Sequence, residues 1–383
     1  MDFDWREAEG GGCGGDFAGD LGTAGLTDTV CFHSIAFMNS PRTAGFIRLA
    51  MLLCALPLTN SVLAGELEST NLQPEPHLSE AQRDFMKWRF GLFLHFNLGT
   101  FADRDWAGGY EDPALFKPSK LDCGQWADAA KDAGMTYLVL TVKHTEGIAL
   151  YDSAVTTHDI TMFKNYKNGK GDIVREFVAA CRSRGLKVGL YYCLPGDYSD
   201  VEHKNAPPPG KPNLHGLPPE AAGDYTGFIK KQLAELLKNY GPIDLLWIDQ
   251  WGNPYTGKDW PAILAYVRTL QPQCLVLANN AHDLKNSDIL SYEFPWQQRL
   301  PPPDNAVPAE VCDTLQTGQR WFWQRVKQPS DLQSAEAVVA RLKLCNERNA
   351  NYLLDVPPDC DGLISGEHLQ RLREIGALVK VQP

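Results

Sequence analysis

Short apolar runs recur along the chain, separated by longer amphipathic stretches. Seven of these runs have the length of a strand and are apolar at nearly every position, as expected for strands buried on both faces. They lie at Phe90–Phe96, Tyr137–Val142, Lys187–Tyr192, Ile243–Asp249, Cys274–Ala278, Ile289–Glu293 and Asn351–Val356.

The intervening stretches carry apolar residues three and four positions apart, which is the period of an amphipathic helix. They cover Gln125–Ala133, Ile173–Arg184, Tyr225–Tyr240, Trp260–Leu270 and Ala335–Arg348. Gly134 and Gly185 follow two of them, and glycine commonly ends a helix in the left-handed conformation. Because strand and helix alternate throughout, we predict an α/β fold of the (β/α)8 type, a TIM-like barrel, with its eighth strand around Gly318–Trp323.

The beginning of the chain lacks this alternation. Residues 1–37 are Gly-rich and aperiodic, and we interpret them as an upstream extension without a role in the fold. Residues 38–64 combine a basic segment, the apolar run Leu49–Leu58 and a small residue at Ala64, a pattern typical of a secretory signal peptide. The alternative is a cytoplasmic tail ahead of a buried helix. With cleavage after Ala64, residues 65–383 form one barrel domain that is secreted or periplasmic.

Charge and cysteine spacing exclude other classes of protein. The net charge of −11 and the absence of a basic run argue against a nucleic-acid partner. The apolar run near the start is too short to span a bilayer, so we expect no stable membrane insertion after signal cleavage. Seven cysteines follow Ala64 without a CxxC pair, which argues against a structural zinc site. Several lie in apolar elements and are expected to be small core residues, and their odd number means that at least one thiol is free or that pairing is intermolecular.

Carboxylates end two of the predicted strands, at Asp249 and Glu293. The reactive side chains of a (β/α)8 barrel lie at the C-terminal ends of its strands. Only the strand at Cys274–Ala278 separates the two, so they can converge as the roughly 5–5.5 Å pair of a retaining glycosidase. The apolar segment Phe294–Trp296 favours a protonated Glu293 that serves as the acid. The alternatives are a helix N-cap for Asp249 and an exposed ion pair with Arg299 for Glu293.

A second group of polar and aromatic side chains lies at or next to strand ends: His95, Lys143, His144, Trp247 and Trp251. Imidazoles and an ammonium can hydrogen-bond sugar hydroxyls, and an indole packs against the apolar face of a pyranose. The rival interpretation is a zinc site of His95, His144 and Asp249. The H-x-H pair common in barrel metallohydrolases is absent, so we expect neither a metal nor a cofactor. One insertion, Asn205–Pro219, follows the third strand and either shapes substrate access or is merely tolerated.

Many segments, in order along the chain, resemble the α-L-fucosidases of glycoside hydrolase family 29. They are Lys87–Asn97, Glu111–Pro113, Leu115–Pro118, Gln125–Trp126, Lys143–Gly147, Lys170–Arg175, Gly185–Tyr192, Gln232–Gly241, Leu246–Asp249, Val307–Cys312, Trp321–Trp323 and Leu353–Pro358. Glu111–Pro113 and the Val-Pro-Ala-Glu segment at Val307 are more similar to the branch that prefers α-1,3/1,4-linked fucose.

The resemblance implies an exported retaining fucosidase that removes terminal fucose, or a related deoxysugar, from oligosaccharides or polysaccharides. It implies that Asp249 is the nucleophile, because this residue closes the segment that matches the family's Trp-Phe-Asp-Gly motif. The acid/base is assigned to Glu293, with Asp288 and Glu310 as alternatives. His95 and His144 match residues that bind fucose hydroxyls, and Trp106 matches a ring-contacting position.

Three departures from the family pattern weaken the assignment to fucose. The family's Lys-His-His-Asp-Gly-Phe reads Lys143–Ile148 here, with Thr145 in place of the second sugar-binding histidine. Gln250 replaces the glycine after the nucleophile. No β-sandwich segment is evident after the barrel, although the family often has one. A non-catalytic carbohydrate-binding barrel is therefore the alternative function, although such a protein needs no nucleophile.

Overall fold

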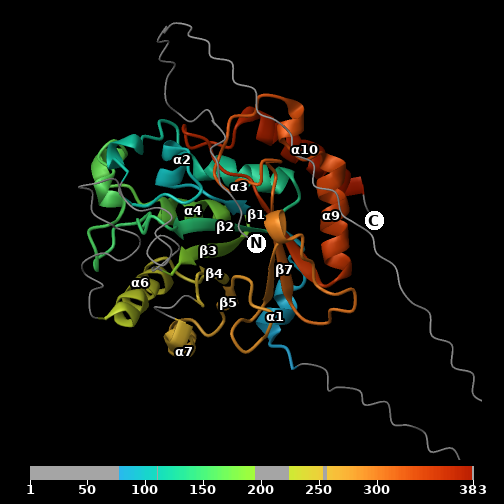
Figure 1. The fold of residues 1–383 in the computed structure, drawn as a ribbon, viewed down its shortest axis with the longest axis horizontal. Coiled ribbons are helices and arrows are strands. Elements are labelled where there is room, and N and C mark those ends of the chain that lie inside the picture. Colours follow the sequence, from blue (N-terminus) through green and yellow to red (C-terminus); the bar gives the residue numbers. More distant parts are fainter. Residues whose placement is uncertain (1–76, 110, 195–223, 253–256, 382–383) are drawn as a thin grey trace, which may run out of the picture. The chain divides into compact units, whose positions relative to one another are not determined.

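The computed structural model describes residues 77–109, 111–194, 224–252 and 257–381 (Figure 1). The predicted upstream extension at 1–37, the predicted signal peptide at 38–64 and the insertion at 205–219 all lie outside these residues.

Eight parallel strands form a nearly closed barrel. Their order in the sheet is β5-β4-β3-β2-β1-β8-β7-β6, and one parallel bridge between Leu277 and Ile289 links the two edge strands. This is the TIM-like architecture that the alternating pattern predicted. The strands are β1 (Phe90–Leu94), β2 (Tyr137–Lys143), β3 (Lys187–Cys193), β4 (Leu245–Asp249), β5 (Leu275–Ala278), β6 (Leu290–Glu293), β7 (Ala309–Thr314) and β8 (Ala350–Asp355).

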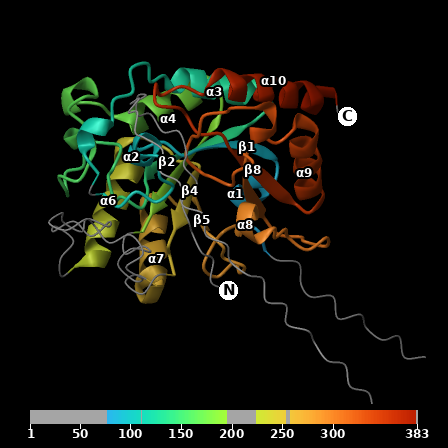
Figure 2. The ribbon, with the colours of Figure 1, turned by 45° about the horizontal axis from the view of Figure 1, so that its top comes forward.

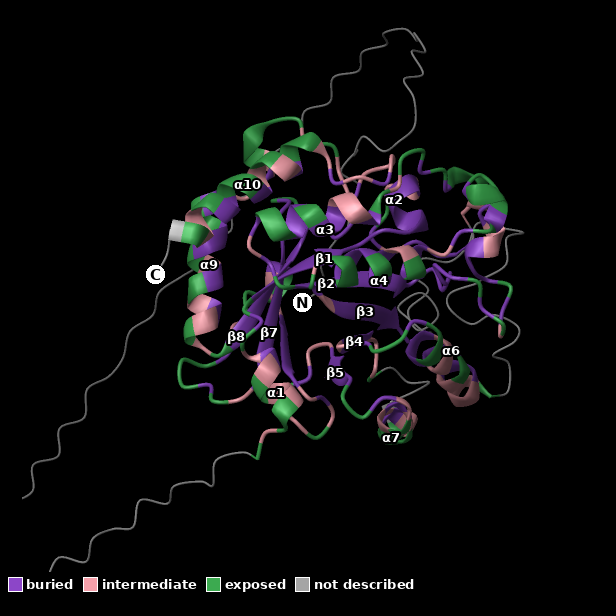
Figure 3. Ribbon diagram, turned by 180° about the vertical axis from the view of Figure 1, so that it is seen from behind, coloured by how far each residue is buried: buried purple, intermediate pink, exposed green. Residues whose placement is uncertain are grey.

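Helices surround the strands, and their buried faces turn towards them (Figures 2 and 3). The five predicted helices are present within three residues at either end, whereas α1, α2, α8 and α10 were not predicted. The helices are α1 (Glu80–Phe85), α2 (Leu98–Ala102), α3 (Cys123–Asp132), α4 (Ile173–Ser183), α6 (Tyr225–Asn239), α7 (Trp260–Leu270), α8 (Phe294–Gln297), α9 (Ala335–Glu347) and α10 (Gly366–Val381). None of the described helices is long and apolar enough to cross a membrane.

The predicted position of the eighth strand was wrong. Gly318–Trp323 forms turns, and the missing strand is β7. The sequence of β7, Ala-Glu-Val-Cys-Asp-Thr, hides it because both faces carry a buried carboxyl group. Glu310 points into the barrel, whereas Asp313 accepts a hydrogen bond from Tyr352 at 2.7 Å and lies 4.0 Å from Arg341 of α9.

Six of the cysteines after Ala64 are buried free thiols, as expected for small core residues. They are Cys123, Cys181, Cys193, Cys274, Cys312 and Cys345.

Aromatic and aliphatic side chains pack in the barrel interior around a buried carboxyl group, that of Glu310. The Glu310 carboxyl accepts hydrogen bonds from Tyr137 Oη at 2.7 Å and from Trp247 Nε1 at 2.8 Å. The Trp247 ring stacks on that of Tyr191, with centroids 5.2 Å apart. Burial raises the pKa of Glu310 to about 7, although both hydrogen bonds act in the opposite direction. The protonated carboxyl therefore favours the folded state.

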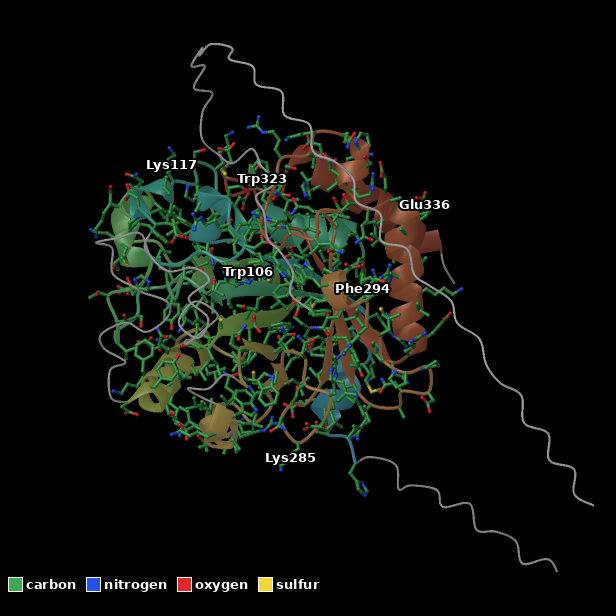
Figure 4. The ribbon with its side chains drawn as sticks, in the orientation of Figure 1. Trp106, Lys117, Lys285, Phe294, Trp323 and Glu336 are labelled. Carbon is green, nitrogen blue, oxygen red and sulfur yellow. The ribbon has the colours of Figure 1, made fainter. Side chains whose placement is uncertain are left out.

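We expect Glu310→Gln to flatten the pH dependence of stability. The folded-state pKa of about 7 lies above the reference value of 4.5, so the contribution of Glu310 is complete below pH 4.5 and lost as the pH rises through 7. This loss, of about 3 kcal/mol, should be absent in the glutamine variant. Urea unfolding at pH 5 and pH 7.5 measures it. The exposed Glu336 on α9 (Figure 4) offers a matched control, Glu336→Gln. Equal slopes for wild type and Glu310→Gln would contradict the interpretation.

Candidate active site

Asp249 is the last residue of β4, and its carboxylate receives three hydrogen bonds. Tyr191 Oη donates to Oδ2 at 2.8 Å, while the Gln250 backbone N–H and Asn279 Nδ2 donate to Oδ1 at 2.9 and 3.1 Å. Such donors fix the orientation of a carboxylate and stabilise its negative charge. Strand pairing aligns Tyr191 with Trp247, so the tyrosine ring rises from the barrel interior towards Asp249.

Glu293 ends β6 and precedes α8 directly. Its Oε2 accepts hydrogen bonds from Asn280 Nδ2 at 3.0 Å and from Asn279 Nδ2 at 3.4 Å. Burial, reinforced by the negative charge of Asp249, raises the pKa of Glu293 to about 7, against the lowering effect of the two amides. A carboxyl group with this pKa can donate a proton near neutral pH.

The side-chain amide of Asn279 joins the two carboxyl groups. Its nitrogen lies 3.1 Å from Asp249 Oδ1 and 3.4 Å from Glu293 Oε2. These two oxygens are therefore no farther apart than both distances together, about 6.5 Å. The roughly 5–5.5 Å spacing of the carboxyl groups in retaining glycosidases falls within this limit for the two oxygens. Trp251 Nε1 donates to the backbone carbonyl oxygen of Asn279 at 2.8 Å and so helps to hold this residue in place.

His95, which follows β1, forms a buried pair with Asp355 at the end of β8. Its Nδ1 lies 2.8 Å from Asp355 Oδ1. Burial, together with the neighbouring His144, holds the pKa of His95 well below its usual value. Burial and the nearby Asp105 raise the pKa of Asp355 well above its own. Both shifts favour the uncharged form of the side chain, and the hydrogen bond uses Nδ1 and leaves Nε2 for a ligand.

His144 follows β2 and lies beside His95, with ring centroids 5.5 Å apart. Its ring stacks on Tyr191 at 5.4 Å, and burial lowers its pKa to about 3. Thr145, predicted to replace a sugar-binding histidine, is buried and donates to the Ala107 carbonyl at 3.2 Å. Its hydroxyl also lies 3.3 Å from His144 Nδ1. Two neutral imidazoles thus face the same rim as the two carboxyl groups.

Lys143 lies outside this cluster, contrary to the prediction that it binds the sugar. Its ammonium lies 2.9 Å from Tyr192 Oη and 3.3 Å from Gln232 Oε1, between the outer face of the barrel and α6. The cause is an irregular register between Thr141 and Lys143, where β2 pairs with β3. Such an irregularity turns a side chain to the other face of a strand.

The three predicted sugar-binding tryptophans occupy different places. Trp247 is buried under the site, where its indole is bound to Glu310. Trp251 packs against Trp260 and holds Asn279. Only Trp106 contributes to an aromatic group beside the site, with its ring 6.2 Å from that of Trp296.

The alternatives for the acid/base lie away from Asp249. Asp288 precedes β6 at the opposite end of the barrel, where Arg268 binds both of its oxygens, at 2.9 and 2.5 Å. Glu310 lies in the interior beneath Trp247. The proposed exposed pairing of Glu293 with Arg299 is also wrong, because Glu293 is bound to the two asparagines.

The sequence did not reveal four residues of this cluster: Tyr191, Asn279, Asn280 and Asp355. Asn279 and Asn280 follow β5 directly, and Asp355 ends β8, so the rule that placed Asp249 at a strand end could have found them. Tyr191 carries no such signal, because it lies within an apolar run. Within the described residues, no group of three or more His, Cys, Asp or Glu side chains could hold a metal ion.

We expect Asn280→Gly to raise the pKa of Glu293 further above 7. The substitution removes a hydrogen bond to the charged form that is worth about 1.5 kcal/mol, and glycine accepts the φ of 56° at this position. Titration of the ¹³C-labelled Glu293 carboxyl by NMR measures the change. Asn286→Gly, in the same loop, removes amide contacts to Asp283 and should leave the pKa unchanged. An unchanged or lower pKa in Asn280→Gly would show that the amide does not stabilise the carboxylate.

Comparison with known proteins identifies a matching family and several relatives of the chain. The family model described as Alpha-L-fucosidase matches residues 108–382. Alpha-L-fucosidase 1 of Arabidopsis thaliana is 27% identical over 338 residues, which cover 80% of this chain and 61% of the relative. Plasma alpha-L-fucosidase of Homo sapiens is 30% identical over 285 residues, covering 71% and 56%. The chain thus spans about three fifths of the length of these curated relatives.

Solved structures show the same relationship. Alpha-L-fucosidase isoenzyme 1 from Paenibacillus thiaminolyticus is similar with a TM-score of 0.61 and 30% identity, covering 79% of this chain and 76% of that one. A glycoside hydrolase 29 family member from an unknown rumen bacterium gives a TM-score of 0.63 and 28% identity, covering 79% and 57%. The chain therefore belongs to the α-L-fucosidase family, glycoside hydrolase family 29.

Proposed function

We propose that this protein is a retaining α-L-fucosidase that hydrolyses terminal fucose, or a related deoxysugar, from glycans. The observation that carries the proposal is the pair of strand-end carboxyl groups bridged by Asn279, of which Glu293 has a pKa of about 7. Two titratable groups whose surroundings give them different protonation states can serve as nucleophile and acid.

The proposed reaction has two steps. Asp249 attacks the anomeric carbon while the bond to the leaving oxygen breaks, and Glu293 protonates that oxygen. Water then attacks the same carbon, Glu293 takes its proton, and the bond to Asp249 breaks. The neutral imidazoles of His95 and His144 are placed to hydrogen-bond the sugar hydroxyls, since they lie on the same rim.

The proposal extends to linkage and location. We propose substrates with α-1,3/1,4-linked fucose, which the segments Glu111–Pro113 and Val307–Cys312 support by resemblance. We also propose export, which the composition of residues 38–64 supports.

The nucleophile is tested by removing its carboxylate. Asp249→Gly should lower the hydrolysis of an aryl α-L-fucoside by several orders of magnitude, because no covalent intermediate forms. Azide should restore turnover and give the inverted glycosyl azide, since it attacks through the vacated space. Wild type with azide serves as the control. If Asp249→Gly keeps nearly full activity, another residue is the nucleophile, and fucose binding by an inert wild type would instead support a carbohydrate-binding barrel.

The acid is tested with leaving groups of different basicity. Glu293→Ala should impair the hydrolysis of fucosyl oligosaccharides far more than that of an activated nitrophenyl fucoside, because a good leaving group departs without a proton. The ratio of kcat/KM on the two substrates measures this. Equal losses on both would assign proton transfer to another residue.

A further inference from the structure

Trp296 is unusually exposed for its size. Of the described large apolar side chains, only Trp296 at 36% and Leu115 at 38% are exposed to this extent. Indoles are usually largely buried, and tryptophan is enriched at interfaces, where one part of the ring is apolar and another meets water.

Trp296 is tied by the chain to the proposed acid. Glu293 is the N-cap of α8, and Trp296 lies one turn further along this short helix. The segment between them is anchored, because the guanidinium of Arg341 from α9 lies 3.6 Å from the centroid of the Phe294 ring and Pro295 is buried. The acid and the exposed indole therefore hold fixed positions relative to each other.

A row of rings connects Trp296 with the sugar-binding rim. Its ring meets the edge of Trp321 with centroids 5.3 Å apart, and Trp321 lies nearly parallel to the His95 ring at 5.1 Å. Trp106 approaches Trp296 from the loop after α2, at 6.2 Å. Figure 4 shows Trp106 over the centre of the strands, whereas Lys117, Lys285 and Glu336 lie towards the periphery. The row thus runs from a buried imidazole to an exposed indole.

The role of Glu293 as the proposed acid indicates which part of the substrate lies beside the Trp296 indole. A general acid must reach the oxygen of the bond that breaks, so the leaving group is on the same side of the substrate as Glu293. The exposed face of an indole packs against the apolar C–H face of a pyranose.

We propose that Trp296, flanked by Trp106, binds the pyranose ring to which the terminal fucose is attached. This inference rests on the proposed function and adds a residue that recognises the leaving sugar. The indole supplies a stacking surface for the leaving sugar and takes no part in proton transfer.

The test compares two substrates that share fucose and differ in the leaving group. Trp296→Ala should lower kcat/KM on a fucosylated oligosaccharide about tenfold, mainly through KM. It should leave the hydrolysis of α-L-fucosyl fluoride within about twofold of wild type, because fluoride has no ring to stack. Trp296→Phe keeps an aromatic face and should recover most of the loss. Leu115→Ala, at the other exposed apolar side chain, should change neither substrate.

The outcomes separate this inference from the proposed function. If wild type hydrolyses neither substrate, the proposed function fails. If wild type is active and Trp296→Ala loses equally on fluoride and oligosaccharide, Trp296 supports the rim that binds fucose, and the inference is overturned. It is also overturned if Trp296→Ala leaves the oligosaccharide reaction unchanged, or if Trp296→Phe recovers no more than the alanine variant.

Discussion

The hydrogen bond between the Trp247 indole and the buried Glu310 carboxyl holds in place the side chains directly beneath the candidate site. A carboxyl group inside a barrel is costly unless it is hydrogen-bonded, and here two donors bind Glu310 while burial raises its pKa to about 7 and so favours its uncharged form. Trp247, held in this way, stacks on Tyr191, and Tyr191 donates to Asp249. Glu310 therefore acts through Trp247 and Tyr191 on the orientation of the proposed nucleophile. The hydrogen-bonded interior of the barrel thus contributes to the geometry of the site.

Asp249 and Glu293, the two carboxyl groups at the rim, differ in their surroundings. Two carboxyl groups with oxygens within about 6.5 Å of each other cannot both be charged without a cost in free energy, and different hydrogen-bond partners reduce this cost. Asp249 receives a phenol, a backbone N–H and an amide, whereas Glu293 receives only side-chain amides, and burial together with the charge of Asp249 raises its pKa. Asn279 contacts both, so the same side chain holds their spacing and limits how far the pKa of Glu293 rises.

Sequence reasoning located strand ends where a carboxyl group closes an apolar run. Asp249 and Glu293 each end such a run, and the structure places them at the ends of β4 and β6, where both contact Asn279. It failed where chemistry interrupted the pattern, since Glu310 and Asp313 disguise β7. It also failed for Lys143, because the irregular strand register near this residue determines where its side chain points and has no signature in the sequence. Tyr191 reads as a core residue, and only the folded barrel shows that its hydroxyl reaches Asp249.

The four residues from Glu293 to Trp296 form one short segment, yet each lies in a different environment. Glu293 faces the asparagines, Phe294 lies under Arg341, Pro295 is buried, and Trp296 is exposed. Arg341 also lies near Asp313 of β7, so α8 is attached through α9 to the strand next to β6. Because the segment is anchored at Phe294 and Pro295, its backbone places the proposed acid and the exposed indole one helical turn apart. Under the proposed function, the group that protonates the leaving oxygen and the side chain that contacts the leaving sugar are therefore carried by the same anchored segment.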